Sequence, residues 1–181
     1  MRFRSLNEAA PMGGPGEIVQ IDESLMRGRR KYNRGRILAG NLLPPGRRNY
    51  GGQVVGPWVF GLVHKRGDGT QDLRMFHVLR RNEITLRAII QRHVAPGTTI
   101  MSDQWRAYTN VARWPNFNYL HETVNHDQHF VNPATGANTQ RIESNWAHVK
   151  TKILRSMRGT RQNLLPGHLA EYWWRQIHRK T

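Results

Sequence analysis

Two apolar segments joined by a short turn sequence place the strongest constraint on the fold of this chain. Residues 57–65 read PWVFGLVHK and residues 72–79 read DLRMFHVL, and the link RGDGTQ between them contains Asp68-Gly69. An Asp-Gly pair between two β-type segments predicts a tight hairpin, because its backbone readily takes the positive φ angles that such turns require. The chain must therefore contain an antiparallel pair of strands onto which the rest of the fold is built.

Three further strands and four helices are predicted around this hairpin. The strand segments are EIVQID, TTIMSD and YLHETV, at residues 17–22, 98–103 and 119–124. Asn82 is suited to cap a helix that runs to Val94 and ends before Pro96-Gly97. Its apolar side would consist of Ile84, Leu86, Ile89, Ile90 and Val94. The other helices are expected over residues 105–113, within residues 136–153, and over residues 167–178.

Up to the helix within residues 136–153, the order of elements is β-β-β-α-β-α-β-α, and the helix over residues 167–178 closes the chain. The first three strands form an antiparallel meander, and helical connections make the fourth and fifth strands parallel to their neighbours. We therefore expect an α/β domain of the RNase H-like fold, with a five-stranded mixed sheet flanked by helices. By analogy with that fold, the fourth strand lies beside the first. Asp22 and Asp103, which end these two strands, would then lie at the same edge of the sheet.

A third acidic residue, Glu143, lies in the first turn of the helix within residues 136–153. Lys150 follows seven residues later, about 20° away around the helix. The pair borders an apolar stripe of Ile142, Trp146, Val149 and Ile153. Together, Asp22, Asp103 and Glu143 could hold two Mg²⁺ or Mn²⁺ ions, because these cations prefer oxygen ligands. Two such ions promote phosphodiester cleavage, and Lys150 would contact a DNA phosphate.

The charge of the chain predicts a polyanionic partner. Its 28 Lys and Arg residues exceed its 12 Asp and Glu residues by 16, and the sequence pI is about 11.5. Residues 27–36, RGRRKYNRGR, hold six cations in ten residues, with a tyrosine among them. Such a segment favours contact with the phosphate backbone over reading of bases. We expect DNA contacts at Arg27, Arg29, Arg30, Lys31, Tyr32, Arg34, Arg36, His126, Lys150 and Lys152.

Several kinds of protein are excluded or disfavoured by features that the sequence lacks. The chain has no Cys, which rules out disulfides and Cys-ligated zinc modules. No stretch approaches the roughly 18 apolar residues of a membrane span, and the first 20 residues contain no apolar signal-peptide core. We therefore expect a soluble intracellular protein with no membrane partner, located in the nucleus of a eukaryote or otherwise in the cytoplasm at the nucleoid.

The sequence resembles the catalytic domain of Merlin-type DDE transposases and their bacterial insertion-sequence relatives. The resemblance rests on VQIDES, KYNRGR, WVFGLV, SDQWRAY, TVNHDQHFVNPATGANTQRIESNWAHVK and LAEYWWR, in this order, from about Glu17 to Arg175. It implies a metal-dependent enzyme that cuts transposon ends and joins them to target DNA. The metal-binding triad would be Asp22, Asp103 and Glu143. The partner would be double-stranded DNA, bound by a homodimer or a higher oligomer.

The domain boundaries and two alternative functions also follow from this comparison. Residues 1–16 are expected to form a flexible Pro/Gly-rich lead-in, and residues 17–181 to form the catalytic domain. Family members usually carry an N-terminal DNA-binding module, so the chain would be a catalytic fragment or a shortened relative. The alternatives are a domesticated, inactive DNA-binding protein of the same fold and a plain metal-dependent nuclease.

Some individual residues have simpler structural interpretations. Glu23 should point away from Asp22 and lie at the surface, while Asp103 could also cap the turn that follows it. Trp146, Trp173 and Trp174 are interpreted as core and helix-packing residues. His126 and His129 are interpreted mainly as loop residues, with His126 the better candidate for contact with DNA.

Overall fold

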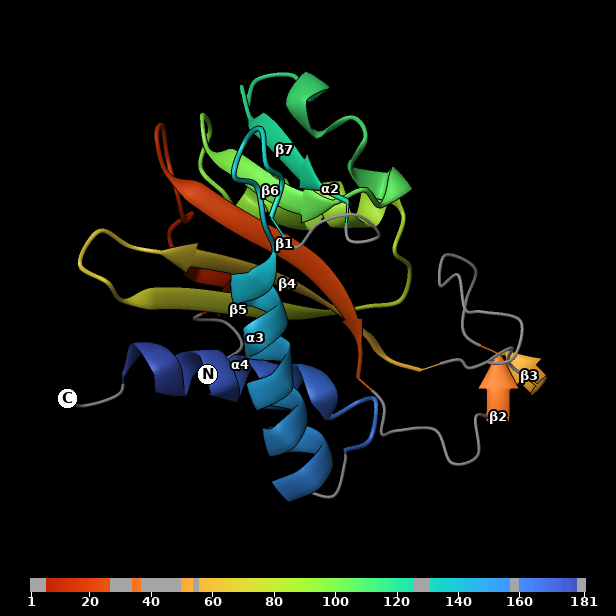
Figure 1. Cartoon of the computed structure of the whole chain (residues 1–181). Coiled ribbons are helices and arrows are strands. Elements are labelled where there is room, and N and C mark those ends of the chain that lie inside the picture. The colour runs from red at the N-terminus through yellow and green to blue at the C-terminus, as the bar shows by residue number, and fades with distance from the viewer. Residues whose placement is uncertain are drawn as a thin grey trace.

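The computed structural model describes residues 6–26, 34–36, 50–53, 56–125, 131–156 and 160–178. Its centre is a five-stranded sheet with the order β5-β4-β1-β6-β7 (Figure 1). These strands are β1 (Ile18–Leu25), β4 (Trp58–Lys65), β5 (Gln71–Val78), β6 (Thr99–Asp103) and β7 (Leu120–Val124). Two short segments, β2 (Arg34–Arg36) and β3 (Tyr50–Gln53), pair in parallel as a separate sheet.

The predicted hairpin is present between β4 and β5. The two strands pair antiparallel along their whole length, from Trp58 opposite Val78 to Lys65 opposite Gln71. Gly69 has a φ of 84° and its N–H donates to the carbonyl of Arg66 at 2.9 Å. The positive φ explains why a glycine follows Asp68 in this turn.

The pairing of the other strands confirms the expected mixed sheet. β1 runs antiparallel to β4, so the first three strands of the sheet form a meander. β6 lies beside β1 and parallel to it, with Gln20 opposite Met101, and β7 runs parallel to β6. The carboxyl ends of β1 and β6 therefore point toward the same edge of the sheet.

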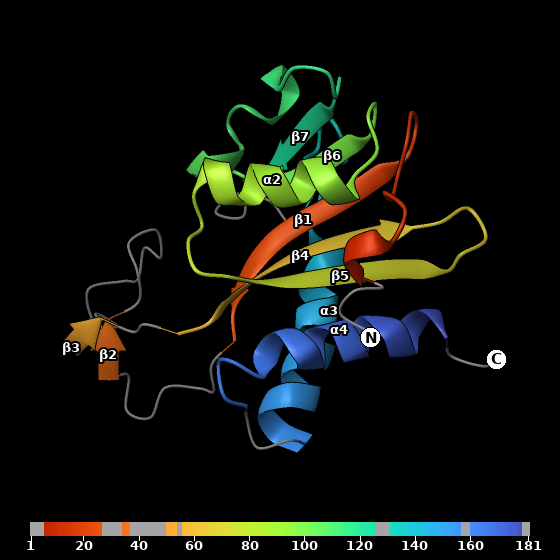
Figure 2. The ribbon, with the colours of Figure 1, turned by 180° about the vertical axis from the view of Figure 1, so that it is seen from behind.

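Helices cover both faces of this sheet. α2 (Glu83–His93) packs on one face, and Asn82 caps it by accepting a hydrogen bond from the N–H of Thr85 at 3.1 Å. α3 (Gln140–Lys150), which continues as the π-helical turn η5 (Thr151–Ser156), packs on the other face. Figure 2, seen from behind, shows α2 in front of the sheet and α3 beyond it. α4 (Leu165–Ile177) packs against the edge strand β5 and against α3.

Two apolar clusters hold these layers together. On the α2 face, Val19, Ile21 and Phe60 pack against Leu86 and Ile90. On the α3 face, the stripe predicted from the sequence, Ile142, Trp146, Val149 and Ile153, is buried against β4 and β5. The apolar side predicted for α2 is wrong at Ile84, which is 81% exposed. Ile84 lies in the first turn of α2, and the core of this layer begins two residues later, at Leu86.

The helix predicted over residues 105–113 is instead two 3₁₀ turns, η3 (Arg106–Tyr108) and η4 (Val111–Arg113). The large buried side chains of this stretch are Tyr108, Val111 and Trp114, which are three residues apart, and the small Ala107 is buried beside them. A spacing of three places side chains on one face of a 3₁₀ helix, whereas an α-helix needs a mixture of three and four. The packing on the α2 face therefore favours the tighter turns.

The described part of the predicted flexible lead-in, residues 6–16, packs against the domain. Leu6 is buried beside α4, and Met12 is buried next to α2. The N–H of Met12 donates to the carbonyl of His93 at 2.8 Å, and the N–H of Ala95 donates to the carbonyl of Met12 at 2.9 Å. The segment thus gains backbone pairing and buried apolar area that its Pro/Gly content did not indicate. No helix in the described ranges is long and apolar enough to cross a membrane.

Candidate active site

The two predicted aspartates lie on the same face of the sheet, near the end of β6. Asp103 ends β6, but the prediction that the first strand ends on Asp22 is wrong, because β1 continues to Leu25 through its pairing with β4. Gln20 in β1 is opposite Met101 in β6, and Asp22 and Asp103 lie two residues further along these parallel strands. Side chains that are two residues apart on a strand point to the same face. Asp22 is on the α3 face, because its Oδ2 accepts a hydrogen bond from the indole Nε1 of Trp146 at 2.8 Å. The expectation that these strands bring the two acids to one edge is therefore confirmed.

The electrostatics of Asp22 show that the two carboxyl groups interact. The pKa of Asp22 is raised to about 7, first by burial, then by the negative charge of Asp103 and, to a smaller extent, by that of Glu143. The hydrogen bond from Trp146 acts in the opposite direction. A cation bound here would favour the ionised form of Asp22, which burial and the charge of Asp103 oppose.

Trp146 reaches Asp22 because the opposite strand carries a glycine. Gly61 in β4 is paired with Asp22, and a Cβ atom built on Gly61 would lie 2.7 Å from Cζ2 of Trp146. The indole ring therefore lies directly on the sheet, with its N–H directed at the carboxylate. The prediction that Trp146 is a core residue is confirmed, and its contact with Asp22 is an addition that the sequence did not indicate.

A buried glutamine positions the N-terminus of α3. The side chain of Gln20, which lies on the same face of β1 as Asp22, accepts hydrogen bonds from the N–H groups of Arg141 and Ile142 at 3.1 and 3.2 Å. Its Nε2 donates to the side chain of Asn138 at 2.9 Å. These bonds satisfy N–H groups that have no partner within the helix. The sequence hinted at this role only through a polar residue within an apolar strand.

Glu143 lies at the start of α3, where its position is set by this docking. It is exposed, and its Oε1 accepts a hydrogen bond from the hydroxyl of Thr139 at 2.8 Å. Within the described ranges, no three His, Asp or Glu side chains come close enough together to form a metal-binding group. The fold brings Asp22 and Asp103 together, and Glu143 remains at a greater distance from this pair. The pair fits as part of a divalent-metal site, since both groups offer hard oxygen atoms.

Glu23 is not the surface acid that was predicted. It does point away from Asp22, but η3 covers this face of the sheet, and the hydroxyl of Tyr108 donates to Glu23 at 2.7 Å. The pKa of Glu23 is raised to about 8, first by burial and then by the charges of Asp22 and Asp103, while the hydrogen bond from Tyr108 acts in the opposite direction. The carboxyl edge therefore carries Glu23 as an additional acid on the α2 face.

Asp103 also has the capping role that was expected of it. Its Oδ1 accepts a hydrogen bond from the backbone N–H of Trp105 at 2.9 Å. This bond supports the backbone at the turn that leads into η3 and orients the carboxyl group. The same residue can therefore stabilise the turn and face Asp22.

Lys150 lies one turn after Trp146 on α3 and is half-buried. Burial lowers the pKa of its ammonium group, whereas the negative charge of Asp22 raises it. Among the described residues Lys150 forms no salt bridge, so it is directed toward the acid pair without closing an ion pair with Glu143. Lys152, in η5, is exposed.

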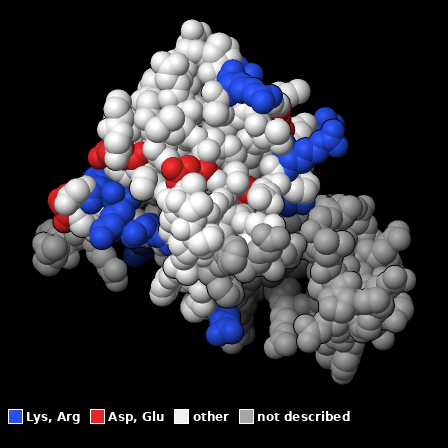
Figure 3. Space-filling model, turned by 45° about the horizontal axis from the view of Figure 1, so that its top comes forward, with Lys and Arg blue, Asp and Glu red and all other residues white. Residues whose placement is uncertain are grey.

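The other predicted DNA contacts are mostly outside the described residues. Arg27, Arg29, Arg30, Lys31, Tyr32 and His126 lie there, as does His129. Arg34 and Arg36 form part of β2. Figure 3 shows the top of the molecule brought forward, where acidic side chains lie between groups of basic ones. Basic side chains on both sides of an acidic centre would attract a polyanion toward this face.

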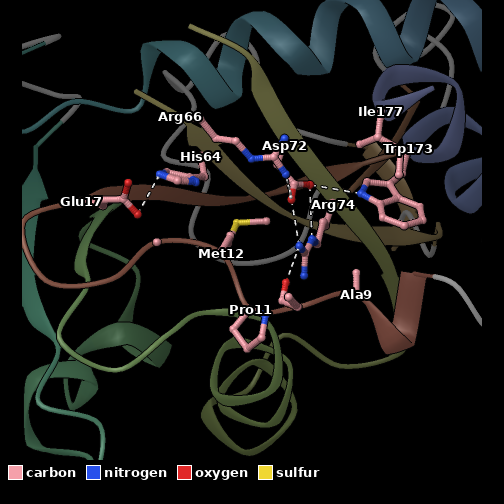
Figure 4. Close-up of a pocket in the computed structure, with 12 residues that line it drawn as sticks. Ala9, Pro11, Met12, Glu17, His64, Arg66, Asp72, Arg74, Trp173 and Ile177 are labelled. Carbon is pink, nitrogen blue, oxygen red and sulfur yellow. Dashed lines mark hydrogen bonds and ion pairs between the residues drawn. The ribbon is translucent and has the colours of Figure 1, made fainter. Parts of the chain in front are cut away.

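A separate cavity of about 650 Å³ lies near the N-terminal end of β1 (Figure 4). Its lining includes Asp72, whose carboxylate accepts from Arg74 at 2.8 Å and from the indole of Trp173 at 3.1 Å. Arg74 also donates to the carbonyl of Ala10 at 2.7 Å. These bonds connect β5, α4 and the N-terminal segment, so the buried charges have a structural role. None of the three predicted acids lines this cavity.

Comparison with known proteins gives one result that covers nearly the whole chain. No curated protein matches the sequence. A family model described as the ISXO2-like transposase domain matches residues 14–176. This range includes every strand of the main sheet, the helices α2 and α3, and the acids at the carboxyl edge. The chain therefore belongs to the ISXO2-like transposase family, in agreement with the insertion-sequence part of the resemblance.

Proposed function

We propose that this protein is a DDE-type transposase of RNase H-like fold that cleaves transposon ends and joins their 3′-hydroxyls to target DNA. The observation that carries the proposal is that Asp22 and Asp103 lie on neighbouring parallel strands, where the negative charge of Asp103 raises the pKa of Asp22. The strand order β5-β4-β1-β6-β7 supports the fold assignment. The sequence motifs further favour the Merlin-type branch of these enzymes.

Asp22 and Asp103 would hold Mg²⁺ or Mn²⁺, with Glu143 as the third ligand of a two-ion site. When bound, two such ions supply Lewis-acid activation of the attacking oxygen and stabilisation of the leaving oxygen of a phosphodiester. Trp146 holds Oδ2 of Asp22 by its indole N–H and thereby fixes the orientation of the carboxyl group that would bind the metal. Gln20 holds the N-terminus of α3 against β1 and thereby limits the positions that Glu143 can take.

DNA would approach this edge along basic groups on α3 and in the segment at residues 27–36. The ammonium group of Lys150 would contact a phosphate entering the site, because it lies near Asp22 but has no carboxylate partner within the described part of the chain. The transfer of two ends into one target requires two active sites. We therefore propose a homodimer or a higher oligomer on double-stranded DNA.

Substitution of the three acids tests this function. Asp22→Asn, Asp103→Asn and Glu143→Gln should each abolish Mg²⁺-dependent nicking and strand transfer, because each removes a negative charge with little change of volume. Their affinity for DNA in EDTA should stay close to that of the wild type. Asp68→Asn is a matched control, since this exposed aspartate lies in the β4–β5 turn at the opposite edge of the sheet.

Three outcomes would change the assignment in different ways. Retained nicking by any one of the three variants would remove that residue from the site. Wild-type protein that binds DNA but neither nicks nor joins it in Mg²⁺ or Mn²⁺ would instead favour a domesticated DNA-binding protein. Nicking without joining of a pre-cut end would favour a plain nuclease.

A further inference from the structure

Arg81 occupies an unusual place between β5 and α2. Its guanidinium carbon lies 3.6 Å from the centroid of the Trp58 ring and 4.7 Å from that of Trp105. The indole Nε1 of Trp105 also donates to the backbone carbonyl of Arg81 at 3.2 Å. Two tryptophans therefore hold both the backbone and the side chain of this residue. Figure 2 shows the connection that leads from the end of β5 to the start of α2, and Arg81 belongs to this connection.

The donors of the Arg81 side chain find no acceptor among the residues that the structure describes. In the described part of the chain its guanidinium group makes no hydrogen bond and no salt bridge. Arg74 is the opposite case, since it donates to Asp72, to the carbonyl of Ala10 and to a ring nitrogen of His93. A guanidinium has five N–H donors around its edge, and stacking on aromatic rings occupies only its faces.

Arg81 lies next to the proposed catalytic edge. Trp105 connects the two sites, because its ring contacts Arg81 and its backbone N–H donates to Asp103 at 2.9 Å. The positive charge of Arg81 also acts on Glu23, the residue that follows Asp22. Arg81 thus lies on the α2 side of the acids, whereas Lys150 approaches them from the α3 side.

We propose that Arg81 is a binding site for a backbone phosphate of the DNA strand that enters the acid site. The inference rests on the proposed transposase function and adds a contact on the side of the sheet opposite α3. Trp58 and Trp105 hold the plane of the guanidinium, and its free edge donates to phosphate oxygens, which a planar fork matches well. A phosphate held here and another held by Lys150 would place the strand across Asp22 and Asp103.

The role of Arg81 is tested by DNA affinity measured as a function of salt. Wild type, Arg81→Ala and Arg81→Lys are titrated with a short DNA duplex of arbitrary sequence in EDTA, at several salt concentrations. Arg81→Ala should bind about ten- to a hundredfold more weakly, as expected for loss of a charge-assisted hydrogen bond. Its slope of log affinity against log salt should be smaller by about 0.9, which corresponds to one lost phosphate contact. Arg81→Lys should keep the wild-type slope, and it should bind DNA more tightly than Arg81→Ala but more weakly than wild type.

Arg87→Ala is the matched control. Arg87 lies over a tryptophan ring too, 5.4 Å from the centroid of Trp114, but its charge acts on Glu83, away from the acids. The Arg87→Ala variant should keep both the wild-type affinity for DNA and the wild-type dependence of that affinity on salt. Thermal unfolding of each variant identifies any loss of folded protein, and a purely structural role of Arg81 would lower the melting temperature without changing the slope.

The possible failures are distinguishable. If wild type binds and nicks DNA but Arg81→Ala has the same affinity and slope, the phosphate contact is wrong and the proposed function stands. If Arg81→Ala and Arg87→Ala lose affinity equally, the contact is not specific to this edge and the inference is also overturned. If wild type does not bind the duplex at all, both the proposed function and the proposed phosphate contact are wrong.

Discussion

At Asp22, burial and a neighbouring carboxylate both oppose ionisation, and this has a measurable effect on stability. The pKa of Asp22 is raised from an ordinary 3.8 to about 7 in the folded protein. The folded state then binds this proton more tightly than the unfolded state, so stability should fall as the pH rises from about 4 to about 7. Above this range the full penalty is present. The acids at the carboxyl edge are thus kept at the expense of stability.

We predict that Asp22→Asn stabilises the metal-free protein at pH 8 but not at pH 4. The gain at pH 8 should be about 1 to 3 kcal/mol, because the variant removes a charge that burial disfavours. Thermal unfolding in EDTA between pH 4 and pH 8 measures this difference. Mg²⁺ should raise the melting temperature of wild type more than that of the variant at pH 8.

Asp68→Asn provides the opposite case in the same measurement. Hydrogen bonds from Thr70 lower the pKa of this exposed carboxyl group, so its ionised form supports the folded state above the ordinary pKa. Its substitution should therefore reduce stability slightly at pH 8 and leave it unchanged at low pH. A stabilising effect of Asp22→Asn that is equal at pH 4 and pH 8 would show that charge is not its cause.

Gly61 gives a second prediction at the scale of one residue. Gly61→Ala should destabilise the protein by about 1 to 3 kcal/mol, because the added methyl group would lie within 3 Å of both Trp146 and Ile142. It should also weaken the hydrogen bond from Trp146 to Asp22 and reduce nicking. Unfolding experiments and the indole N–H resonance of Trp146 measure these two effects.

Gly167→Ala, in α4, is the control for this change. No atom lies within 4 Å of a Cβ built on Gly167, so the substitution should be neutral or stabilise the helix by about 0.5 to 1 kcal/mol. Unchanged stability of Gly61→Ala would mean that the Trp146 ring can move aside, and its contact with Asp22 would then have little importance.

At the scale of elements, three polar contacts with the sheet hold α3 in position beside the acids. Gln20 holds its N-terminus, Trp146 bonds to Asp22, and Asn145 accepts from the side chain of Gln71 in β5 at 2.8 Å. The helix is therefore attached by polar groups as well as by its apolar stripe. This attachment also determines which way Lys150 points.

We predict that Lys150→Ala reduces strand transfer about ten- to a hundredfold, while Mn²⁺ affinity changes little. The reason is the loss of a charge-assisted phosphate contact, typically worth about 1.5 to 3 kcal/mol. End cleavage, joining of a pre-cut end and Mn²⁺ binding should be compared for Lys150→Ala, Lys150→Arg and the exposed control Lys65→Ala. If Lys150 only formed an exposed ion pair, its removal would change the free energy by under about 1 kcal/mol. Joining at the wild-type rate by Lys150→Ala would exclude the phosphate contact.

At the scale of the whole molecule, a net charge of +16 surrounds a small group of acids. Replacement of Arg29, Arg30 and Lys31 by Ala should weaken binding to all DNA sequences alike and reduce the salt slope by about 0.9 for each lost phosphate contact. Filter binding to several unrelated duplexes at graded salt measures both effects. Loss of affinity for one sequence alone would show that this segment reads bases.

The sequence by itself determined the features that depend on neighbours along the chain. The β4–β5 hairpin follows from Asp68-Gly69, the cap of α2 from Asn82, and the buried stripe of α3 from spacings of three and four residues. Turn conformation, capping and periodicity are local properties, so one stretch of sequence is enough to predict them. The order of these elements also predicted that Asp22 and Asp103 meet at one edge.

Only the tertiary structure decided what covers each face of the sheet. Glu23 is half-buried because η3 lies over it, and the large buried side chains of η3, η4 and the residue after them, Tyr108, Val111 and Trp114, recur every third position, which fits two 3₁₀ turns. The contacts of Gln20 with α3, of Trp146 with Asp22, and of Arg81 with two tryptophans each join residues that are more than 20 positions apart in sequence. Such contacts depend on how whole elements pack, and neither propensity nor spacing within a segment contains that information.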